Sequence, residues 1–343
     1  MRTTPISKFR RSIAENDLFG QLAGRIVGQP QALSQIVPYV KMHQAGLAPE
    51  GRPAGVFLLL GPTGTGKTRT VEVLAHALHG NEKQMLKVDC GEFQMEHEVA
   101  KLIGAPPGYL GHRETQPMLS QQKLNSVTSD RSSLSLLLFD EIEKAAPSMT
   151  RMMLGILDKA VLRLGDNTSV NFENTMIFLT SNLGADAMRK ELHPDFGFEM
   201  MLPERLNAAR SSKKLESIGM GAVKRKFSPE FVNRIDSVIT YQPLDTKSLA
   251  VIVDHQIDAL QKHINARLAE RGFKIHVSKE ARQFLLEKGT SDEYGARELK
   301  RTILRQLTQP LATMVSEGKI LPEDVVFVRT SAEGAGLDFT VDE

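Results

Sequence analysis

The segment Gly61–Thr68, with the sequence GPTGTGKT, combines residue types that bind phosphate groups. It follows the apolar run Val56–Leu60 and precedes apolar residues at the spacing of one helix face, which is the strand, turn and helix arrangement of a P-loop. Its glycines let backbone N–H groups approach a phosphate without Cβ clashes, and the helix N-terminus adds a partial positive charge. Lys67 is expected to contact the β- and γ-phosphates, and the hydroxyl of Thr68 to bind Mg²⁺. The predicted contacts to a nucleoside triphosphate are Gly61, Pro62, Thr63, Gly64, Thr65, Gly66, Lys67, Thr68 and Arg69.

Two carboxylates follow another apolar run at a place where they could act on the same phosphates. Asp140 and Glu141 come directly after Leu134–Phe139, so they are expected at the carboxyl edge of a parallel sheet, where ligands bind. Asp140 is placed to hold Mg²⁺ through water, and Glu141 to polarise an attacking water. Asn182 follows the apolar run Thr175–Thr180 and could orient the same water, although a turn-forming Asn would look the same in the sequence.

Apolar runs that alternate with helical patterns predict the elements that position these residues. The alternation is typical of an α/β fold with a parallel sheet and helices on both faces. The run Leu134–Phe139 is apolar almost throughout, as expected for a strand that is buried on both faces. Five strands are expected, at residues 56–60, 85–89, 134–139, 175–180 and 237–241.

The pattern changes character at Pro243. Apolar residues between Leu249 and Leu268 follow one helix face, with Asp245 or Thr246 as the N-cap. Further helices are expected at residues 279–288 and 296–315, and short strands at 273–277, 325–328 and 337–341. We therefore predict an N-terminal arm (1–20), a large α/β nucleotide-binding domain (21–242) and a smaller, mostly helical C-terminal domain (243–343).

Composition excludes several classes of protein. The 43 Lys and Arg residues nearly balance the 41 Asp and Glu residues, which argues against nucleic acid or a membrane as the main partner. Cys90 is the only cysteine, so neither an internal disulfide nor a CxxC metal site can form. No apolar run approaches 18 residues and the start of the chain has no apolar signal segment. A cytoplasmic location is therefore expected.

Five motifs occur in an order that resembles one known family. The chain is similar, from about Arg25 to Val328, to the second ATPase module of Clp-type AAA+ protein unfoldases and disaggregases. This resemblance implies a P-loop AAA+ sheet of five parallel strands, followed by a small helical domain. It also implies that the nucleotide is ATP with Mg²⁺. The motifs are Gly61–Thr68, Leu136–Ala145, Leu179–Gly184, Phe227–Asp236 and Tyr294–Arg301.

The resemblance implies a role for individual residues. Asn182 matches the residue called sensor 1, and Arg297 matches sensor 2, which contacts the nucleotide of its own subunit. Arg234 matches the arginine finger, which reaches the γ-phosphate in a neighbouring subunit and so implies a ring, for this family a homo-hexamer. Val27 lies in a segment that resembles the one beside the adenine. These cations suit phosphoryl transfer, for which Lys67 and Mg²⁺ alone supply incomplete charge stabilisation.

A glycine- and proline-rich segment, residues 104–111, bears on the kind of substrate. Residues 104–111, GAPPGYLG, resemble the central-pore loop of the family, in which Tyr109 would grip an unfolded polypeptide. An aromatic ring contacts many side chains without needing one particular partner. The resemblance therefore implies a ring ATPase that remodels or unfolds proteins by threading them. The alternative is an ordinary loop in which Tyr109 packs locally.

The chain departs from the family pattern in three places. The polar stretch Ser120–Ser133 is longer than usual, which leaves the geometry of the grip open. Few residues precede the P-loop, so a stand-alone single-module form is expected, with substrates brought by an adaptor or a separate partner. Phe196-Gly197-Phe198 lies where protease-coupled members carry a docking tripeptide, but related disaggregases also have Phe-Gly there, so a protease ring is only one possible partner.

Two other classes of function stay open at this stage. The basic stretch Arg205–Lys226 is compatible with an AAA+ ATPase that acts on nucleic acid, although a solvated helix face or a subunit interface is the favoured interpretation. A nucleotide-dependent assembly switch that does no threading is also compatible with the P-loop.

Overall fold

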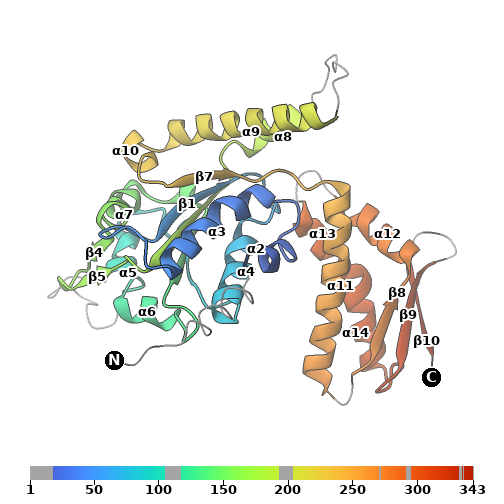
Figure 1. Ribbon diagram of the computed structural model, residues 1–343. Helices are drawn as coiled ribbons and strands as arrows, with labels where there is room; N and C mark the ends of the chain where they lie inside the picture. Colours follow the sequence, from blue (N-terminus) through green and yellow to red (C-terminus); the bar gives the residue numbers. More distant parts are fainter. Residues whose placement is uncertain are drawn as a thin grey trace, which may run out of the picture. The chain divides into compact units, whose positions relative to one another are not determined.

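The computed structural model describes residues 18–104, 117–192, 204–269, 272–290, 295–331, 334 and 336–342 (Figure 1). The chain divides into two compact units. The first comprises Met1–Gly61 and Gly66–Gln242, and the second Pro62–Thr65 and Pro243–Glu343. Within the described part of the chain, no helix is both long and apolar enough to cross a membrane.

The first unit is built on the predicted sheet of five parallel strands. The strand order is β2-β3-β6-β1-β7, and every neighbouring pair is parallel. The predicted fold class is confirmed. The strands are β1 (Gly55–Leu60), β2 (Leu86–Asp89), β3 (Ser135–Asp140), β6 (Thr175–Ser181) and β7 (Ser237–Thr240).

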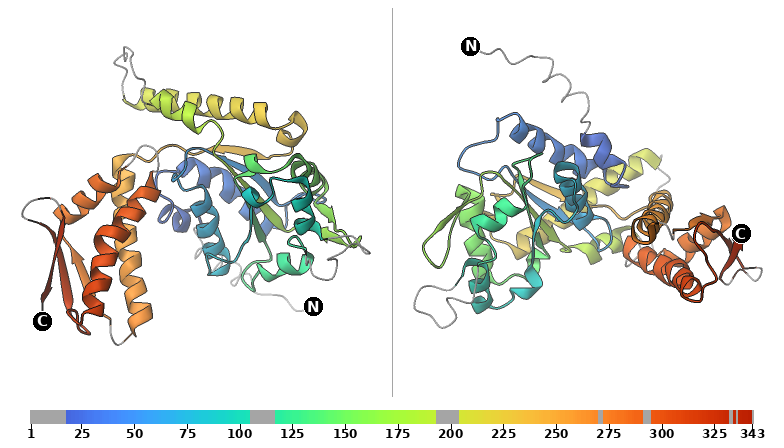
Figure 2. Two further views of the ribbon diagram at one scale, coloured as in Figure 1. Left: turned by 180° about the vertical axis from the view of Figure 1, so that it is seen from behind. Right: turned by 90° about the horizontal axis from the view of Figure 1, so that it is seen from below.

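Helices cover both faces of this sheet, and side chains alternate between the two resulting cores (Figures 1 and 2). In β3, Leu137 and Phe139 belong to one core and Leu136 and Leu138 to the other. This explains why the inner strands β1, β3 and β6 are mostly apolar rather than alternating. One core is shared with α2 (Leu18–Ala23), α3 (Pro30–Gln44) and α4 (Lys67–His79). The other is shared with α5 (Ala100–Ile103), α6 (Gln121–Ser126) and α7 (Pro147–Lys159).

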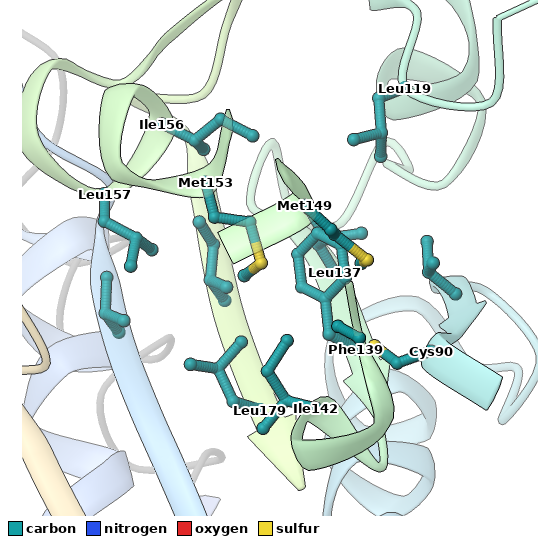
Figure 3. Packing of buried hydrophobic residues seen from close by; sticks show 14 of the residues in the cluster. Cys90, Leu119, Leu137, Phe139, Ile142, Met149, Met153, Ile156, Leu157 and Leu179 are labelled. Carbon is teal, nitrogen blue, oxygen red and sulfur yellow. The ribbon is translucent and has the colours of Figure 1, made fainter. Parts of the chain in front are cut away.

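The packing of α7 on the sheet is typical of these cores (Figure 3). Met149 and Met153 of α7 are fully buried and lie over Leu137 and Phe139 of β3. Leu179 of β6 completes this part of the cluster. Burial of one such side chain stabilises the fold by about 1.5–3 kcal/mol, so the cluster holds β3 and β6 rigidly side by side.

Strand β3 begins and ends at polar residues. At its start the Ser135 hydroxyl lies 3.2 Å from the carbonyl oxygen of Asn174 and 2.8 Å from the hydroxyl of Thr175. At its end lies Asp140, next to Thr180 of β6. The residues between are apolar and fully buried.

The structure adds a small hairpin that the sequence did not predict. Strands β4 (Val161–Arg163) and β5 (Ser169–Asn171) follow α7 and pair in antiparallel fashion. Three helices come later in the unit, and α9 contacts β7. They are α8 (Ala185–Leu192), α9 (Glu204–Lys226) and α10 (Pro229–Val232).

The second unit has a core of helices and a three-stranded sheet. The sheet order is β10-β9-β8, with β8 parallel and β10 antiparallel to β9. All of the predicted strands are present, and the region predicted as one helix over 296–315 contains a π-helical turn at Leu304–Thr308. The elements are α11 (Thr246–Leu268), β8 (Lys274–Val277), α12 (Lys279–Gly289), α13 (Ala296–Ile303), α14 (Gln309–Ser316), β9 (Val325–Thr330) and β10 (Leu337–Asp342).

The start of α11 offers a first test of this architecture. Asp245 is the N-cap, and its carboxylate accepts a hydrogen bond from the backbone N–H of Ser248 at 2.8 Å. Asp245→Ala is expected to lower the free energy of unfolding by about 1 kcal/mol because this bond is lost. The hydrogen bonds from Ser248 lower the pKa of Asp245 below its usual value. The stabilisation is therefore complete at neutral pH and is lost as the pH falls through the lowered pKa of the folded state.

Urea unfolding followed by circular dichroism checks this expectation. Asp258→Ala is the matched control, because Asp258 is exposed in the middle of the same helix. Equal effects of the two substitutions would show that the cap does not stabilise α11.

Candidate nucleotide-binding and hydrolysis site

The P-loop connects β1 to α4, as the sequence predicted, and its glycines adopt conformations that other residues disfavour. Gly61 has φ 143° and Gly66 has φ 102°, both in the region open mainly to glycine. A Cβ on Gly61 would lie 2.6 Å from the carbonyl oxygen of Tyr241. The chain therefore turns sharply at Gly61, and Gly66 forms the N-cap from which α4 begins.

Lys67 is a buried cation held by oxygen acceptors. Its Nζ donates to the carbonyl oxygen of Gly61 at 2.6 Å and to Oδ1 of Asn182 at 2.9 Å. The residue is only 8% exposed. A buried ammonium is stable only with such partners, and here they fix it at the start of α4, where a helix N-terminus favours anions.

Asp140 lies where β3 ends and is held on both of its oxygens. Oδ1 accepts a hydrogen bond from the hydroxyl of Thr180 at 2.5 Å and lies 3.5 Å from the hydroxyl of Thr68. Oδ2 is 2.6 Å from Nζ of Lys87. Burial raises the pKa of Asp140, but the hydrogen bonds from Lys87 and Thr180 outweigh it and hold the pKa below its usual value. The carboxylate is therefore ionised at neutral pH.

Glu141 adopts an unusual backbone conformation directly after the strand. Its φ of 56° and ψ of 51° lie in the left-handed region, which residues with a Cβ seldom adopt. The backbone N–H donates to the hydroxyl of Thr180 at 3.0 Å. Oε1 accepts from the side-chain amide of Asn182 at 3.3 Å, and Oε2 lies 2.5 Å from Nζ of Lys144. Glu141 and Asn182 thus come together as a carboxylate and an amide, the pair that could bind and activate one water.

The donor set at this edge of the sheet fits Mg²⁺. Thr68 and Asp140 supply a hydroxyl and a carboxylate, the hard oxygen ligands that Mg²⁺ prefers. In the described part of the chain, no cluster of three His, Cys, Asp or Glu side chains could by itself hold a metal ion. Mg²⁺ bound here would therefore take its other ligands from phosphate and water, as is usual when it accompanies a nucleotide.

Arg69 is engaged with carboxylates beside the P-loop. Its guanidinium makes two contacts to Glu82, at 2.6 and 3.0 Å, and one to Glu72 at 3.2 Å. Such a bidentate pair is geometrically specific. A contact from Arg69 to the nucleotide would have to compete with it and remains a prediction.

The segment predicted beside the adenine lies between α2 and α3. Val27 is half-buried there. The nearby Gln29 side chain makes a paired contact with the backbone of Gln242, donating to its carbonyl oxygen at 2.8 Å and accepting from its N–H at 3.2 Å. These two hydrogen bonds fix the segment to the chain that follows β7. The contact of Val27 with adenine remains a prediction.

Arg234 follows α10, which ends at Val232. Its guanidinium donates to the carbonyl oxygen of Glu230 at 2.9 Å and pairs with the carboxylates of Glu230, at 3.2 Å, and of Asp158 in α7, at 3.4 Å. These contacts hold the side chain in place. The role of Arg234 at the γ-phosphate of a neighbouring subunit remains a prediction.

For three of the predicted residues or motifs, the described residues show no contact that bears on the predicted role. Arg297 is exposed in the first turn of α13, in the second unit, and its contact with the nucleotide remains a prediction. Tyr109 and the tripeptide Phe196–Phe198 lie outside the described residues.

Sequence reasoning missed the residues that support the acidic pair. Thr180 lies inside an apolar strand and Lys87 inside β2, so neither belongs to a recognisable motif. Lys144 is only three residues from Glu141, but nothing in the sequence shows that its ammonium group forms an ion pair with that carboxylate. The only available signal was the position of Thr180 two residues before Asn182, near the end of a predicted strand.

Family models match most of the chain. One described as an AAA domain of the Cdc48 subfamily matches residues 52–238. The chain belongs to the AAA family. A second model, described as the C-terminal D2-small domain of ClpB protein, matches residues 244–328. The predicted resemblance to the second module of Clp-type AAA+ proteins is thereby confirmed.

Relatives and solved structures of this AAA family agree. The chain is 36% identical to the chaperone protein ClpB of Meiothermus ruber over 318 residues, which is 92% of this chain and 34% of that protein. It is 37% identical to ClpB of Aquifex aeolicus (strain VF5), covering 92% of this chain and 30% of that protein. A chain in a closed-state cryo-electron microscopy reconstruction of Hsp104 with ATPγS and FITC casein is 28% identical, with a TM-score of 0.78 over 99% of this chain and 53% of that chain. The chain thus spans about one third of the length of the ClpB relatives.

Proposed function

We propose that this chain binds and hydrolyses ATP with Mg²⁺, and that it uses the reaction to remodel or unfold protein substrates. The observation that carries the hydrolysis is the hydrogen-bonded series from Lys67 through Asn182 to Glu141. It connects the phosphate-binding lysine to a carboxylate at the edge of the sheet where ligands of α/β proteins bind.

Each residue of the site has a part in the proposed reaction. Lys67 binds the β- and γ-phosphate oxygens, for which it exchanges its present acceptors, Gly61 and Asn182. Thr68 and Asp140 hold Mg²⁺, Asp140 through water; when bound, the ion neutralises charge that develops on the phosphates. Asn182 orients the attacking water, and Glu141 accepts its proton.

The ring arrangement is part of the proposal. Phosphoryl transfer needs cationic stabilisation beyond Lys67, and the two arginines of the family motifs would supply it. Arg234 would act on the nucleotide of a neighbouring subunit in a homo-hexamer, and Arg297 on that of its own. The support is the match of both family models, together with the contacts to Asp158 and Glu230 that hold the guanidinium of Arg234 in place.

The proposed substrate is a polypeptide gripped by Tyr109. Support comes from the relatives, which are named chaperone protein ClpB, and from the Hsp104 reconstruction, which contains casein. These comparisons favour protein remodelling over the nucleic-acid alternative. An adaptor, a protease ring docked through Phe196–Phe198 and a cytoplasmic location extend the same proposal.

Replacement of Lys67 tests nucleotide binding directly. Lys67→Met keeps the length of the side chain but removes its charge, and it is expected to weaken binding of a fluorescent ATP analogue by about 30- to 1000-fold, because a buried charged contact is lost. Titration followed by fluorescence anisotropy measures the affinity. Lys83→Met is the control, since Lys83 is exposed in the turn after α4. Equal affinities of the Lys67→Met and wild-type proteins would refute the assigned role.

A further inference from the structure

Thr180 contacts both acidic residues of the proposed site. It lies in the central strand β6, next to β3, and is 1% exposed. Its hydroxyl oxygen is 2.5 Å from Oδ1 of Asp140 and 3.0 Å from the backbone nitrogen of Glu141. One buried hydroxyl therefore connects the side chain of Asp140 to the main chain of Glu141.

The direction of both hydrogen bonds follows from the chemistry of the groups. A backbone N–H can only donate, so the hydroxyl of Thr180 accepts from Glu141. The single hydroxyl proton is then available for Asp140, which accepts it as a carboxylate. Because Lys87 holds the other oxygen of Asp140 at 2.6 Å, the plane of the carboxylate is fixed, with Oδ1 on the side of Thr68.

The same hydroxyl supports the turn that presents Glu141. The left-handed conformation of Glu141 is disfavoured for a residue with a Cβ, so it persists only where its surroundings impose it. In this conformation the backbone N–H of Glu141, which is partly buried, is satisfied by the hydroxyl of Thr180. In this conformation the Glu141 carboxylate lies 3.3 Å from the amide of Asn182.

We propose that Thr180 is a positioning residue for both halves of the proposed hydrolysis reaction. Its hydroxyl orients the carboxylate of Asp140 to bind Mg²⁺. It also holds the main chain of Glu141 in the conformation that places the Glu141 carboxylate next to the attacking water. The inference rests on the proposed function. Thr180 itself touches neither the nucleotide nor the water, and acts only through its two neighbours.

Thr180→Val tests the proposal because it removes the hydroxyl and keeps the shape and the branched Cβ. The Mg²⁺ concentration that half-saturates binding of a fluorescent ATP analogue is expected to rise by about 10-fold, as for other groups that orient a metal ligand. The kcat for ATP hydrolysis is expected to fall by about 10- to 100-fold, because small misplacements of a reacting group have effects of this size. The KM for ATP, measured at saturating Mg²⁺, should change much less, since Lys67 and the loop are untouched.

Two matched variants separate positioning from general damage. Thr180→Ser keeps the hydroxyl and should restore both the Mg²⁺ dependence and kcat to near the wild-type values. Thr175→Val removes an equally buried hydroxyl at the opposite end of β6, where Thr175 lies 2.8 Å from Ser135. It should leave both readouts at wild-type values. Thermal unfolding of each variant is measured alongside, and Thr180→Ala replaces Thr180→Val if the latter does not fold.

Three results would overturn the inference alone while the wild-type protein hydrolyses ATP. They are wild-type behaviour of Thr180→Val, a defect of Thr180→Ser as large as that of Thr180→Val, and an equal defect of Thr175→Val. A wild-type protein that neither binds nor hydrolyses Mg²⁺-ATP would instead refute the proposed function, and the inference with it.

Discussion

Glu141→Gln is expected to lower kcat for ATP hydrolysis by about 10²- to 10⁴-fold while ATP still binds. The amide keeps the size of the side chain and can still contact Asn182, which lies 3.3 Å from Oε1. It cannot accept the proton of the attacking water. Lys67, Thr68 and the loop are unchanged, so the affinity for ATP should stay within a few-fold of wild type. Phosphate release and binding of a fluorescent ATP analogue measure the two quantities separately.

The control for this variant is Glu92→Gln, an exposed glutamate outside the site. Hydrolysis by the Glu141→Gln protein at the wild-type rate would remove Glu141 from the mechanism, and loss of ATP binding would show a structural defect instead. If both expectations hold, the variant stays in the ATP-bound state. Proteins that co-purify with it in the presence of ATP then identify the substrates of the proposed remodelling reaction.

Arg234→Ala is expected to lower kcat by about 10³-fold or more, as does removal of other arginine fingers. The contacts of Arg234 to Glu230 and Asp158 hold it beside α10 and α7, and its proposed target is the γ-phosphate bound by a neighbouring subunit. The sites that it serves would therefore belong to a neighbouring subunit. Co-assembly with Glu141→Gln subunits tests this, since those subunits carry an intact Arg234 but cannot hydrolyse ATP. Sites on Arg234→Ala subunits should regain activity when a Glu141→Gln subunit is their neighbour.

The outcome of the mixing experiment is decisive because each variant alone is inactive. Partial recovery of phosphate release requires that the arginine acts across a subunit boundary. No recovery in rings shown to contain both variants would contradict the role in trans. Arg151→Ala is the matched control, because Arg151 is an exposed arginine of α7 that pairs with Glu96 instead. It should hydrolyse ATP at the wild-type rate.

The framework of the site could be predicted because local sequence determines it. The inner strands β1, β3 and β6 are nearly continuous apolar runs, since helices cover both faces of the sheet. The carboxyl end of such a run places the next polar residue at the ligand-binding edge, which is how Asp140, Glu141 and Asn182 could be assigned to one place. Their hydrogen bonds then follow from the strand order, with β3 and β6 as neighbours.

The support of the site could not be predicted, because it depends on contacts between strands. Lys87 reaches Asp140 from β2, and Thr180 reaches it from β6. Strand order and register decide both contacts, and the sequence alone specifies neither. The π-helical turn at Leu304–Thr308 was missed because the sequence pattern indicates a helix there but does not show which backbone hydrogen bonds the helix makes. The hairpin of β4 and β5 is too short for a clear alternation, with three residues in each strand.

The uninterrupted apolar character of β3 has a consequence for its alignment in the sheet. In a strand with one solvent-exposed face, a shift in register by one residue would expose its apolar side chains to water and so cost free energy. If β3 shifted by one residue, each of its apolar side chains would move from one core to the other, and both cores are buried. The shift would therefore cost little buried apolar area. Polar contacts at the two ends therefore favour the observed alignment, with Ser135 against the carbonyl oxygen of Asn174 and Asp140 against Thr180. The residues proposed for chemistry thus also favour the observed alignment of the strand that carries them.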